Sequence, residues 1–135
     1  MTRVQGIGGL FFKAKDPQAL QAWYSEHLDI SPLTTSPWGA DDPASLFVWR
    51  DKDDPDRVCY AVFTPFPADT DYFGPGPQQF MFNFRVDDLD GMLAQLKEEG
   101  IELQGEIQSF PFGRFAHILD PEGNRVELWE PAKGF

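Results

Sequence analysis

Hydrophobic and polar positions alternate from Phe80 to Val86, a period of two that is typical of a β-strand. One face of this strand carries Met81, Asn83 and Arg85, and the other carries Phe82, Phe84 and Val86. The segment after it changes to a helical period, with apolar side chains at Leu89, Met92, Leu93 and Leu96. The pattern predicts a helix whose apolar stripe packs on the Phe82, Phe84 and Val86 face.

Local signals mark where this helix begins and ends. Asp88 is predicted to cap its first turn, and Gly100 to stop it. Further on, the sequence from Asp120 to Asn124 predicts a tight turn, because Pro121 presets φ and Gly123 tolerates a positive φ. Residues 126–129 then form a final strand. The C-terminal half is therefore predicted as one strand, one helix and a closing hairpin.

The N-terminal half repeats this arrangement. Residues 6–14 read as a strand, and Asp16 and Pro17 open a helix whose predicted apolar stripe is Leu20, Trp23, Tyr24 and Leu28. Asp16 follows Gly9 by seven residues, as Asp88 follows Met81. Segments 46–49 and 58–63 are predicted strands, and the stretch around Trp38 is expected to hold another. The chain thus contains two copies of a strand–helix–three-strand module.

The module boundaries follow from composition. Module one spans 1–65, module two spans 80–135, and 66–79 is a linker rich in Pro and Gly. Phe66, Tyr72 and Phe73 make the linker an ordered strap across the surface, and Phe110 and Phe112 are placed at a rim. At 135 residues, the chain is expected to be one α+β domain.

Charge and composition exclude several classes of function. The net charge of −11 argues against nucleic acid and anionic membrane surfaces as partners. No apolar run is long enough to span a membrane, and no signal-peptide core is present, which predicts a cytoplasmic protein. The single cysteine, Cys59, lies in an apolar run and is expected to be a buried hydrophobe. Thirteen Phe and four Trp either fill the core or line a concave apolar site.

Three stretches, taken in order, resemble the vicinal oxygen chelate superfamily of glyoxalases, extradiol dioxygenases and bleomycin-resistance proteins. They are GGLFFKAKDPQALQAWYSEHLDI, FNFRVDDLDGMLAQLKEEGIEL and DPEGNRVELWEP. The resemblance implies that each βαβββ module supplies half of a curled sheet, that the halves form a cup, and that the helices pack outside. It also implies a homodimer.

Metal-dependent members of that family place ligands on the first and last strand of each module. The corresponding positions here are Gly9, Met81, Ala61 and Glu127. Only Glu127 is a suitable ligand for a hard divalent ion, because glycine and alanine have no ligand atom and a thioether is too soft. The expected cofactor is therefore none, with a divalent metal ion as the alternative if other residues replace the ligands.

His117 is the main candidate for such a replacement. If the turn after it is symmetric, His117 lies across from Glu127 on the same face, and Asn83 also faces the cup. The three polar residues then form a cluster whose apolar surroundings are Phe11, Met81, Phe115 and Trp129. This cluster either binds a ligand or acts as a metal-free acid–base pair, or holds a relocated metal, or is a satisfied buried pair. Lys13 and Arg85 occupy strand ends on the predicted cup face, where they are expected to be solvated, the alternative being that they bind a substrate carboxylate at the rim.

The interpretation that follows is a glyoxalase- or bleomycin-resistance-like protein. It binds a small apolar or aromatic molecule in its cup without a catalytic metal. Predicted ligand-binding residues are Phe11, Met81, Asn83, Phe115 and Trp129, and the candidate catalytic pair is His117 and Glu127. The alternatives are a lyase, isomerase or dioxygenase-like enzyme that uses His117 and Glu127 as acid and base or in a relocated metal site, and a purely structural module with a filled cup.

Overall fold

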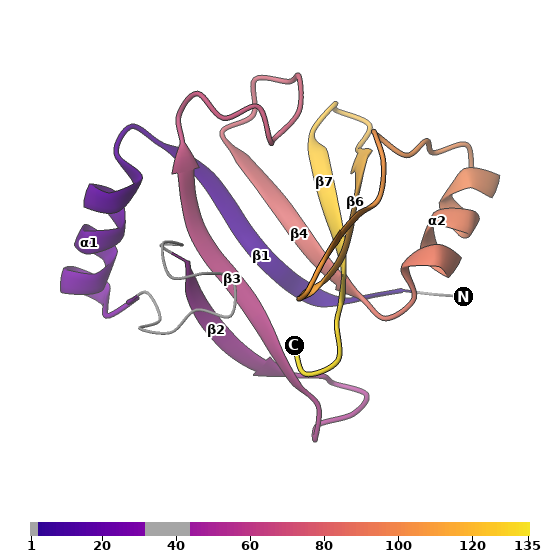
Figure 1. Cartoon of the computed structure of the whole chain (residues 1–135), viewed down its shortest axis with the longest axis horizontal. Helices are drawn as coiled ribbons and strands as arrows, with labels where there is room; N and C mark the ends of the chain where they lie inside the picture. The colour runs from indigo at the N-terminus through magenta and orange to yellow at the C-terminus, as the bar shows by residue number, and fades with distance from the viewer. Residues whose placement is uncertain (1–2, 32–43) are drawn as a thin grey trace.

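The computed structural model describes residues 3–31 and 44–135. Within them the chain forms one curled sheet of seven strands in the order β2-β3-β1-β4-β7-β6-β5, with α1 at the left and α2 at the right of the view in Figure 1. The elements are β1 (Val4–Ala14), α1 (Pro17–Leu28), β2 (Ser45–Arg50), β3 (Val58–Pro67), β4 (Phe80–Val86), α2 (Leu89–Glu98), β5 (Gln108–Phe110), β6 (Gly113–Leu119) and β7 (Arg125–Pro131). The predicted α+β fold with helices outside is confirmed. The strand expected around Trp38 lies outside the described residues.

The two halves join at the middle of the sheet, where β1 and β4 run antiparallel and pair Phe11 with Met81. Each half then repeats the same connection, because β1 pairs with β3 in parallel and β4 pairs with β7 in parallel. The backbone therefore preserves the duplication seen in the sequence. β3 extends to Pro67, two residues into the segment assigned to the linker.

Both helices begin as the sequence predicts. The Asp16 carboxylate accepts a hydrogen bond from the backbone N–H of Ala19, and Asp88 does the same for Gly91. These caps satisfy backbone donors that a first helical turn leaves unpaired. Gly100 follows α2 with a φ of +83°, the left-handed conformation that glycine adopts without steric cost.

The predicted apolar stripe of α1 is only partly correct. Trp23 and Leu28 are 50% and 55% exposed in the described residues, so these two side chains do not pack on the sheet. Tyr24 does pack, with its ring edge-on to that of Phe63 at a centroid distance of 5.2 Å. The buried residue on this helix is Gln21, whose amide donates to the Ser45 hydroxyl at 2.9 Å. A polar contact therefore replaces part of the expected hydrophobic one.

Helix α2 agrees more closely with its prediction. Val86, Leu89, Met92, Ala116 and Leu128 form its buried cluster, with Phe84, Leu93 and Leu96 packed against it. Phe82, expected on the same covered face, is 41% exposed. The helix therefore covers the end of β4 nearest to it but not the middle of the strand.

The face of the sheet that points away from α2 has its own apolar cluster, built from Phe11, Ala44, Val62, Phe73 and Met81. Phe73 comes from the segment after β3 and is fully buried, so this segment is held down as the predicted strap. Cys59 is also fully buried, as predicted. In the described part of the chain, no helix has the length and apolar character that a membrane crossing needs.

Candidate functional site

Glu127 lies on β7, between β4 and β6, and is 1% exposed. Its neighbours in register are Asn83 on β4 and His117 on β6. Asn83 Nδ2 donates to Glu127 Oε1 at 2.6 Å, and His117 Nε2 lies 2.7 Å from Glu127 Oε2. Both partners are almost fully buried. The sheet register therefore gathers the three polar residues that the sequence placed on one face.

A fourth member of this cluster comes from the strap. The Tyr72 hydroxyl donates a hydrogen bond to Glu127 Oε2. The Tyr72 ring stacks on Phe66 and meets the His117 ring edge-on, with centroids 5.2 Å apart. Burial, followed by the negative charge of Glu127, raises the pKa of Tyr72 above its usual value. Tyr72 is thus kept protonated, as a hydrogen-bond donor to the carboxylate.

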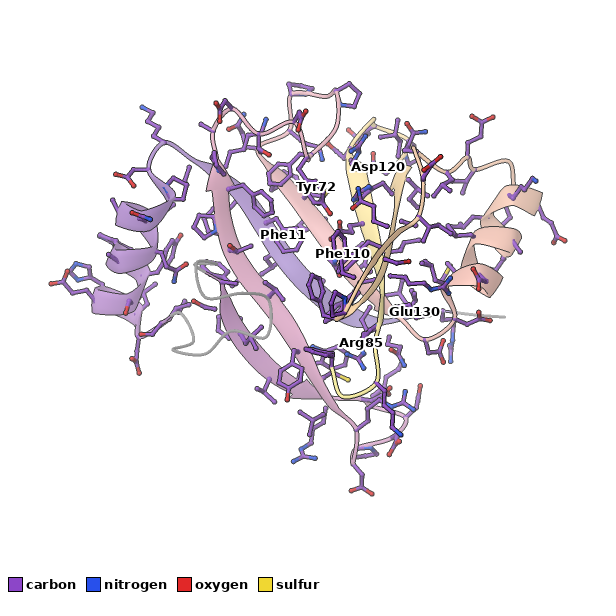
Figure 2. All side chains as sticks on the ribbon, viewed as in Figure 1. Phe11, Tyr72, Arg85, Phe110, Asp120 and Glu130 are labelled. Atoms are coloured by element: carbon purple, nitrogen blue, oxygen red, sulfur yellow. The ribbon has the colours of Figure 1, made fainter. Side chains whose placement is uncertain are left out.

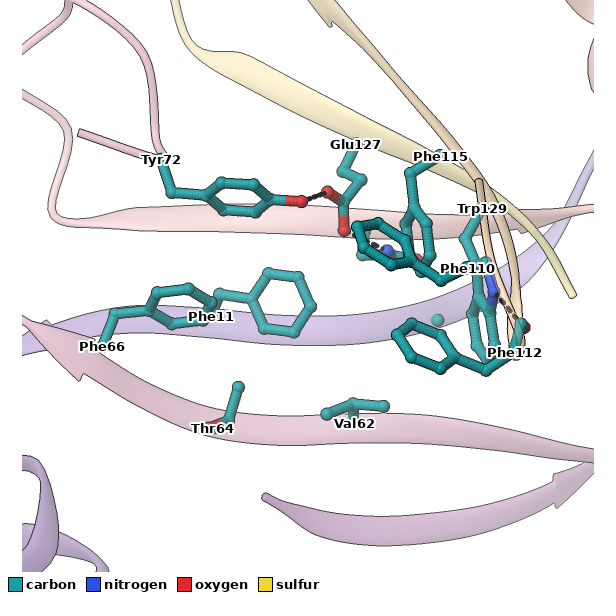
Figure 3. A pocket seen from close by; sticks show the side chains of 12 residues that line it. Phe11, Val62, Thr64, Phe66, Tyr72, Phe110, Phe112, Phe115, Glu127 and Trp129 are labelled. Atoms are coloured by element: carbon teal, nitrogen blue, oxygen red, sulfur yellow. Dashed lines mark hydrogen bonds between the residues drawn. The ribbon is translucent and has the colours of Figure 1, made fainter. Parts of the chain in front are cut away.

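Beside the cluster is a cavity of about 210 Å³ (Figure 3). Its lining among the described residues is mostly aromatic and comprises Gly8, Phe11, Val62, Thr64, Phe66, Tyr72, Asn83, Phe110, Phe112, Phe115, Glu127 and Trp129. Figure 2 places the labelled Phe11 and Phe110 on the inner side of the curled sheet. The cup is therefore open and not filled by the described side chains.

Stacked rings form the wall near β5 and β6. The Phe115 and Trp129 rings are parallel within 3°, with centroids 6.0 Å apart, and so are those of Phe110 and Phe112, at 5.3 Å. Trp129 is further fixed by a hydrogen bond from Nε1 to the carbonyl oxygen of Phe112 at 3.1 Å. Phe110 is 47% exposed, which places it at the mouth. These contacts hold two sets of aromatic rings in place, with the Phe115 ring at 70° to that of Phe110.

Five of the predicted site residues meet at this cavity: Phe11, Asn83, Phe115, Glu127 and Trp129. Met81 does not line it, because Phe73 from the strap packs in the same cluster and Met81 is fully buried. His117 does not line it either, since it lies behind Glu127 and Tyr72. Met81 is thus a core residue, and His117 can reach a ligand only through Glu127.

Arg85 also departs from its prediction. It was expected at a solvated strand end but is 7% exposed, with its guanidinium 5.9 Å from the centroid of the Trp129 ring. Its N–H groups donate to Gln5 Oε1 and to the carbonyl oxygen of Phe135. Burial lowers its pKa. Arg85 is therefore part of the support behind Trp129 and not of the cavity lining.

Two lining residues, Val62 and Thr64, were not predicted from the sequence, because the last strand of module one was aligned with the last strand of module two in the wrong register. Phe11 and Asn83 each precede a helix cap by five residues, so they are equivalent. Their parallel partners are Thr64 and Glu127, which makes Thr64 the counterpart of Glu127. Ala61 had been assigned that position. A shift of three residues along a strand reverses the face, so Ala61 points away from the cavity.

The residues present do not fit the divalent metal of metal-dependent relatives. Gly9, Met81, Thr64 and Glu127 occupy the corresponding positions, and only the last is a carboxylate. Among the described residues, no three His, Cys, Asp or Glu side chains form a group able to hold an ion. His117 Nε2, the best replacement ligand, is engaged with Glu127.

Solved structures of similar fold cover nearly the whole chain. Methylmalonyl-CoA epimerase from Mycobacterium tuberculosis is 24% identical, with a TM-score of 0.59 and coverage of 96% of this chain and 89% of that one. A Streptomyces coelicolor methylmalonyl-CoA epimerase variant in complex with 2-nitronate-propionyl-CoA is 15% identical, with a TM-score of 0.62 and coverage of 94% and 97%. A glyoxalase/bleomycin resistance protein/dioxygenase superfamily member from Vibrio splendidus 12B01 is 13% identical, with a TM-score of 0.54 and coverage of 96% and 98%.

At these identities the likeness concerns the fold. No curated protein sequence gives a significant match. The family comparison is more decisive, because the model of the Glyoxalase/Bleomycin resistance protein/Dioxygenase superfamily matches residues 6–128. That range begins within β1 and ends within β7, and it includes both helices and the other five strands of the described residues. The chain belongs to this superfamily.

Proposed function

We propose that this protein binds a small aromatic or apolar organic molecule in its cavity, without a catalytic metal, and sequesters it. The observation that carries the proposal is the open cavity, walled by the stacked pairs Phe115–Trp129 and Phe110–Phe112. Its volume of about 210 Å³ exceeds the roughly 150 Å³ of an apolar protein cavity that takes up benzene. Aromatic walls of this kind favour flat apolar ligands, which stack on them.

The proposal includes no metal because the site offers too few metal ligands. A lone Glu127 carboxylate gives too few ligands for Lewis-acid chemistry, and its two oxygens already accept hydrogen bonds from Tyr72, Asn83 and His117. Titration with nickel, zinc or iron tests this part. We expect no stoichiometric binding, and binding that disappears in Glu127→Ala would overturn it.

A second candidate is an enzyme that moves a proton at a ligand carbon or oxygen. The observation in its favour is that Glu127 lines the cavity while His117 contacts it from behind, an arrangement suited to an acid–base pair. Because His117 does not reach the cavity, only Glu127 would touch the substrate. Turnover of a bound molecule that Glu127→Gln abolishes would favour this candidate over sequestration.

The binding proposal is tested by filling the cavity. Thr64 lines it and has one weak side-chain contact, 3.5 Å from its hydroxyl to the Pro65 carbonyl oxygen. We expect toluene and indole to shift the NMR signals of lining residues and to quench Trp129 fluorescence in the wild type. Thr64→Phe should remove both effects, because the new ring occupies the space that the ligand needs.

Thr64→Val is the matched control, since it keeps the volume of the side chain and leaves the cavity open. It should bind as the wild type does. Trp129→Phe identifies the fluorescence source, because the chain has four Trp in total. If no aromatic compound perturbs the wild-type spectrum, or if Thr64→Phe binds like Thr64→Val, the cavity is not the binding site.

A further inference from the structure

The side-chain hydrogen-bond donors that line the cavity are already used. Among the described residues that line the cavity, the Tyr72 hydroxyl and Asn83 Nδ2 both donate to Glu127. Trp129 Nε1 donates to the Phe112 carbonyl oxygen. The Thr64 hydroxyl faces the Pro65 carbonyl oxygen. A ligand therefore meets a wall whose side-chain donors are committed to the protein itself.

One acceptor of this wall, in contrast, has no hydrogen-bond partner among the described residues. This acceptor is Asn83 Oδ1, which is buried, and Asn83 as a whole is 1% exposed. Its orientation is fixed, because the carboxylate of Glu127 accepts only and so requires the Nδ2 group to face it. Glu127 Oε1 accepts one hydrogen bond, from Asn83, and a carboxylate oxygen has the lone pairs to accept a second. A buried polar atom without a partner is costly, so this site favours a ligand that donates.

The charge of the lining residues also favours a ligand that donates, and in particular a cationic one. Glu127 is the one charged side chain among the described lining residues. Arg85 lies over the Trp129 ring but does not line the cavity, and its N–H groups are bonded to Gln5 and Phe135. Ring faces attract cations, and a buried carboxylate gains most from a partner of opposite charge.

We propose that the cavity selects ligands that carry a cationic donor, an ammonium or amidinium group, on a small aromatic or apolar body. Glu127 Oε1 and Asn83 Oδ1 accept the donor's hydrogen bonds, and the aromatic wall holds the apolar body. This inference rests on the proposed binding function and narrows it to one chemical class. The protein's net charge of −11 also favours the approach of a cation.

A series of matched probes tests the inference without any variant. Benzylammonium, benzyl alcohol and toluene share one ring and differ in charge and donor number, and benzoate reverses the charge. Dissociation constants measured by NMR or calorimetry near neutral pH should rank benzylammonium tightest. We expect it to bind at least about tenfold more tightly than benzyl alcohol, and benzoate to bind most weakly.

Glu127→Gln keeps the shape of the side chain and removes its charge, so it should reduce the preference for benzylammonium over benzyl alcohol to within about threefold. Glu122→Gln removes the same charge from an exposed turn and should leave the preference unchanged. Equal binding of benzylammonium, benzyl alcohol and toluene would overturn the cationic preference while the binding function stands. Failure of all four probes to bind would overturn the binding function itself. If Glu127→Gln does not fold, the wild-type series alone decides.

Discussion

The two walls of the cavity come from equivalent strands of the duplicated halves and differ in chemistry. In module two, Asn83 on β4 is paired with Glu127 on β7, and in module one their counterparts are Phe11 on β1 and Thr64 on β3. The backbone frame is the same in both. Glu127 binds three polar partners, whereas the Thr64 hydroxyl makes one long contact.

This difference shows how duplication can build an asymmetric site. A symmetric frame supplies two similar walls, and substitution at a few facing positions then places a buried acid and amide in one of them only. A ligand with an apolar end and a donor end therefore has one preferred orientation. The following substitutions compare the two walls through residues that form them or contact them.

The largest effect is expected for Trp129→Ala. Trp129 is 1% exposed, stacks on Phe115 and donates to the Phe112 carbonyl oxygen, so its removal opens a large space in the module-two wall. The free energy of unfolding should fall by about 4 kcal/mol. Phe66→Ala, at the counterpart position in module one, should cost about half as much because Phe66 is only partly buried. Urea unfolding measures both, and equal losses would show that the walls contribute alike.

The adjacent glycines of β1 give the second comparison. A Cβ at Gly8 would lie 2.3 Å from Asn83 Oδ1, an atom held in place by the bond between Asn83 and Glu127. A Cβ at Gly9 would meet the Phe11 ring at 2.8 Å and Asn83 Cβ at 3.2 Å, and the Phe11 ring borders the cavity. Gly8→Ala should therefore cost about 2 kcal/mol, and Gly9→Ala less than about 1 kcal/mol.

The same pair separates effects on the polar cluster from effects on stability. Because the clash at Gly8 displaces Asn83, the NMR signals of the Asn83 amide and the His117 ring should shift in Gly8→Ala. They should shift less in Gly9→Ala, where the nearest contact is the Phe11 ring and Asn83 Cβ lies 3.2 Å away. Equal perturbation by both variants would mean that the two walls do not respond independently.

Part of this site follows from the sequence, because local signals fix it. The turn from Asp120 to Asn124 sets the register of β6 against β7 and so predicts that His117 faces Glu127, as the structure shows. The period of two in β4 likewise places Asn83 beside them. In both cases, a short connection or a single strand determines the geometry.

Other parts depend on contacts between distant segments. No hairpin connects β3 to β1, so its register, and with it the role of Thr64, could not be counted from a turn. Tyr72 lies in an irregular segment, where no periodicity indicates which side chain points inward. Met81 had the correct face, but Phe73 from the same segment packs against it. The inner face of β4 therefore carries both a core residue and a lining residue, and the strand pattern alone does not tell them apart.

Tyr72→Phe should have a smaller effect than Trp129→Ala or Gly8→Ala, and the dependence of this effect on pH makes it specific. The substitution removes the hydrogen bond to Glu127 and keeps the ring on Phe66, so it should cost about 1 kcal/mol at neutral pH. The raised pKa of Tyr72 means that the folded protein keeps this proton while the unfolded chain loses it above about pH 10.

Wild-type stability should therefore decline above about pH 10, by as much as about 1.4 kcal/mol per pH unit from this group. Tyr72→Phe lacks the group and should not show this component, so the difference in unfolding free energy between the two proteins should shrink and vanish near pH 11. Urea unfolding at a series of pH values measures this difference, with Tyr60→Phe as a control at a tyrosine outside the cavity lining. Parallel curves for wild type and Tyr72→Phe would show that Tyr72 is not held protonated by the carboxylate, and would remove the strap from the polar wall.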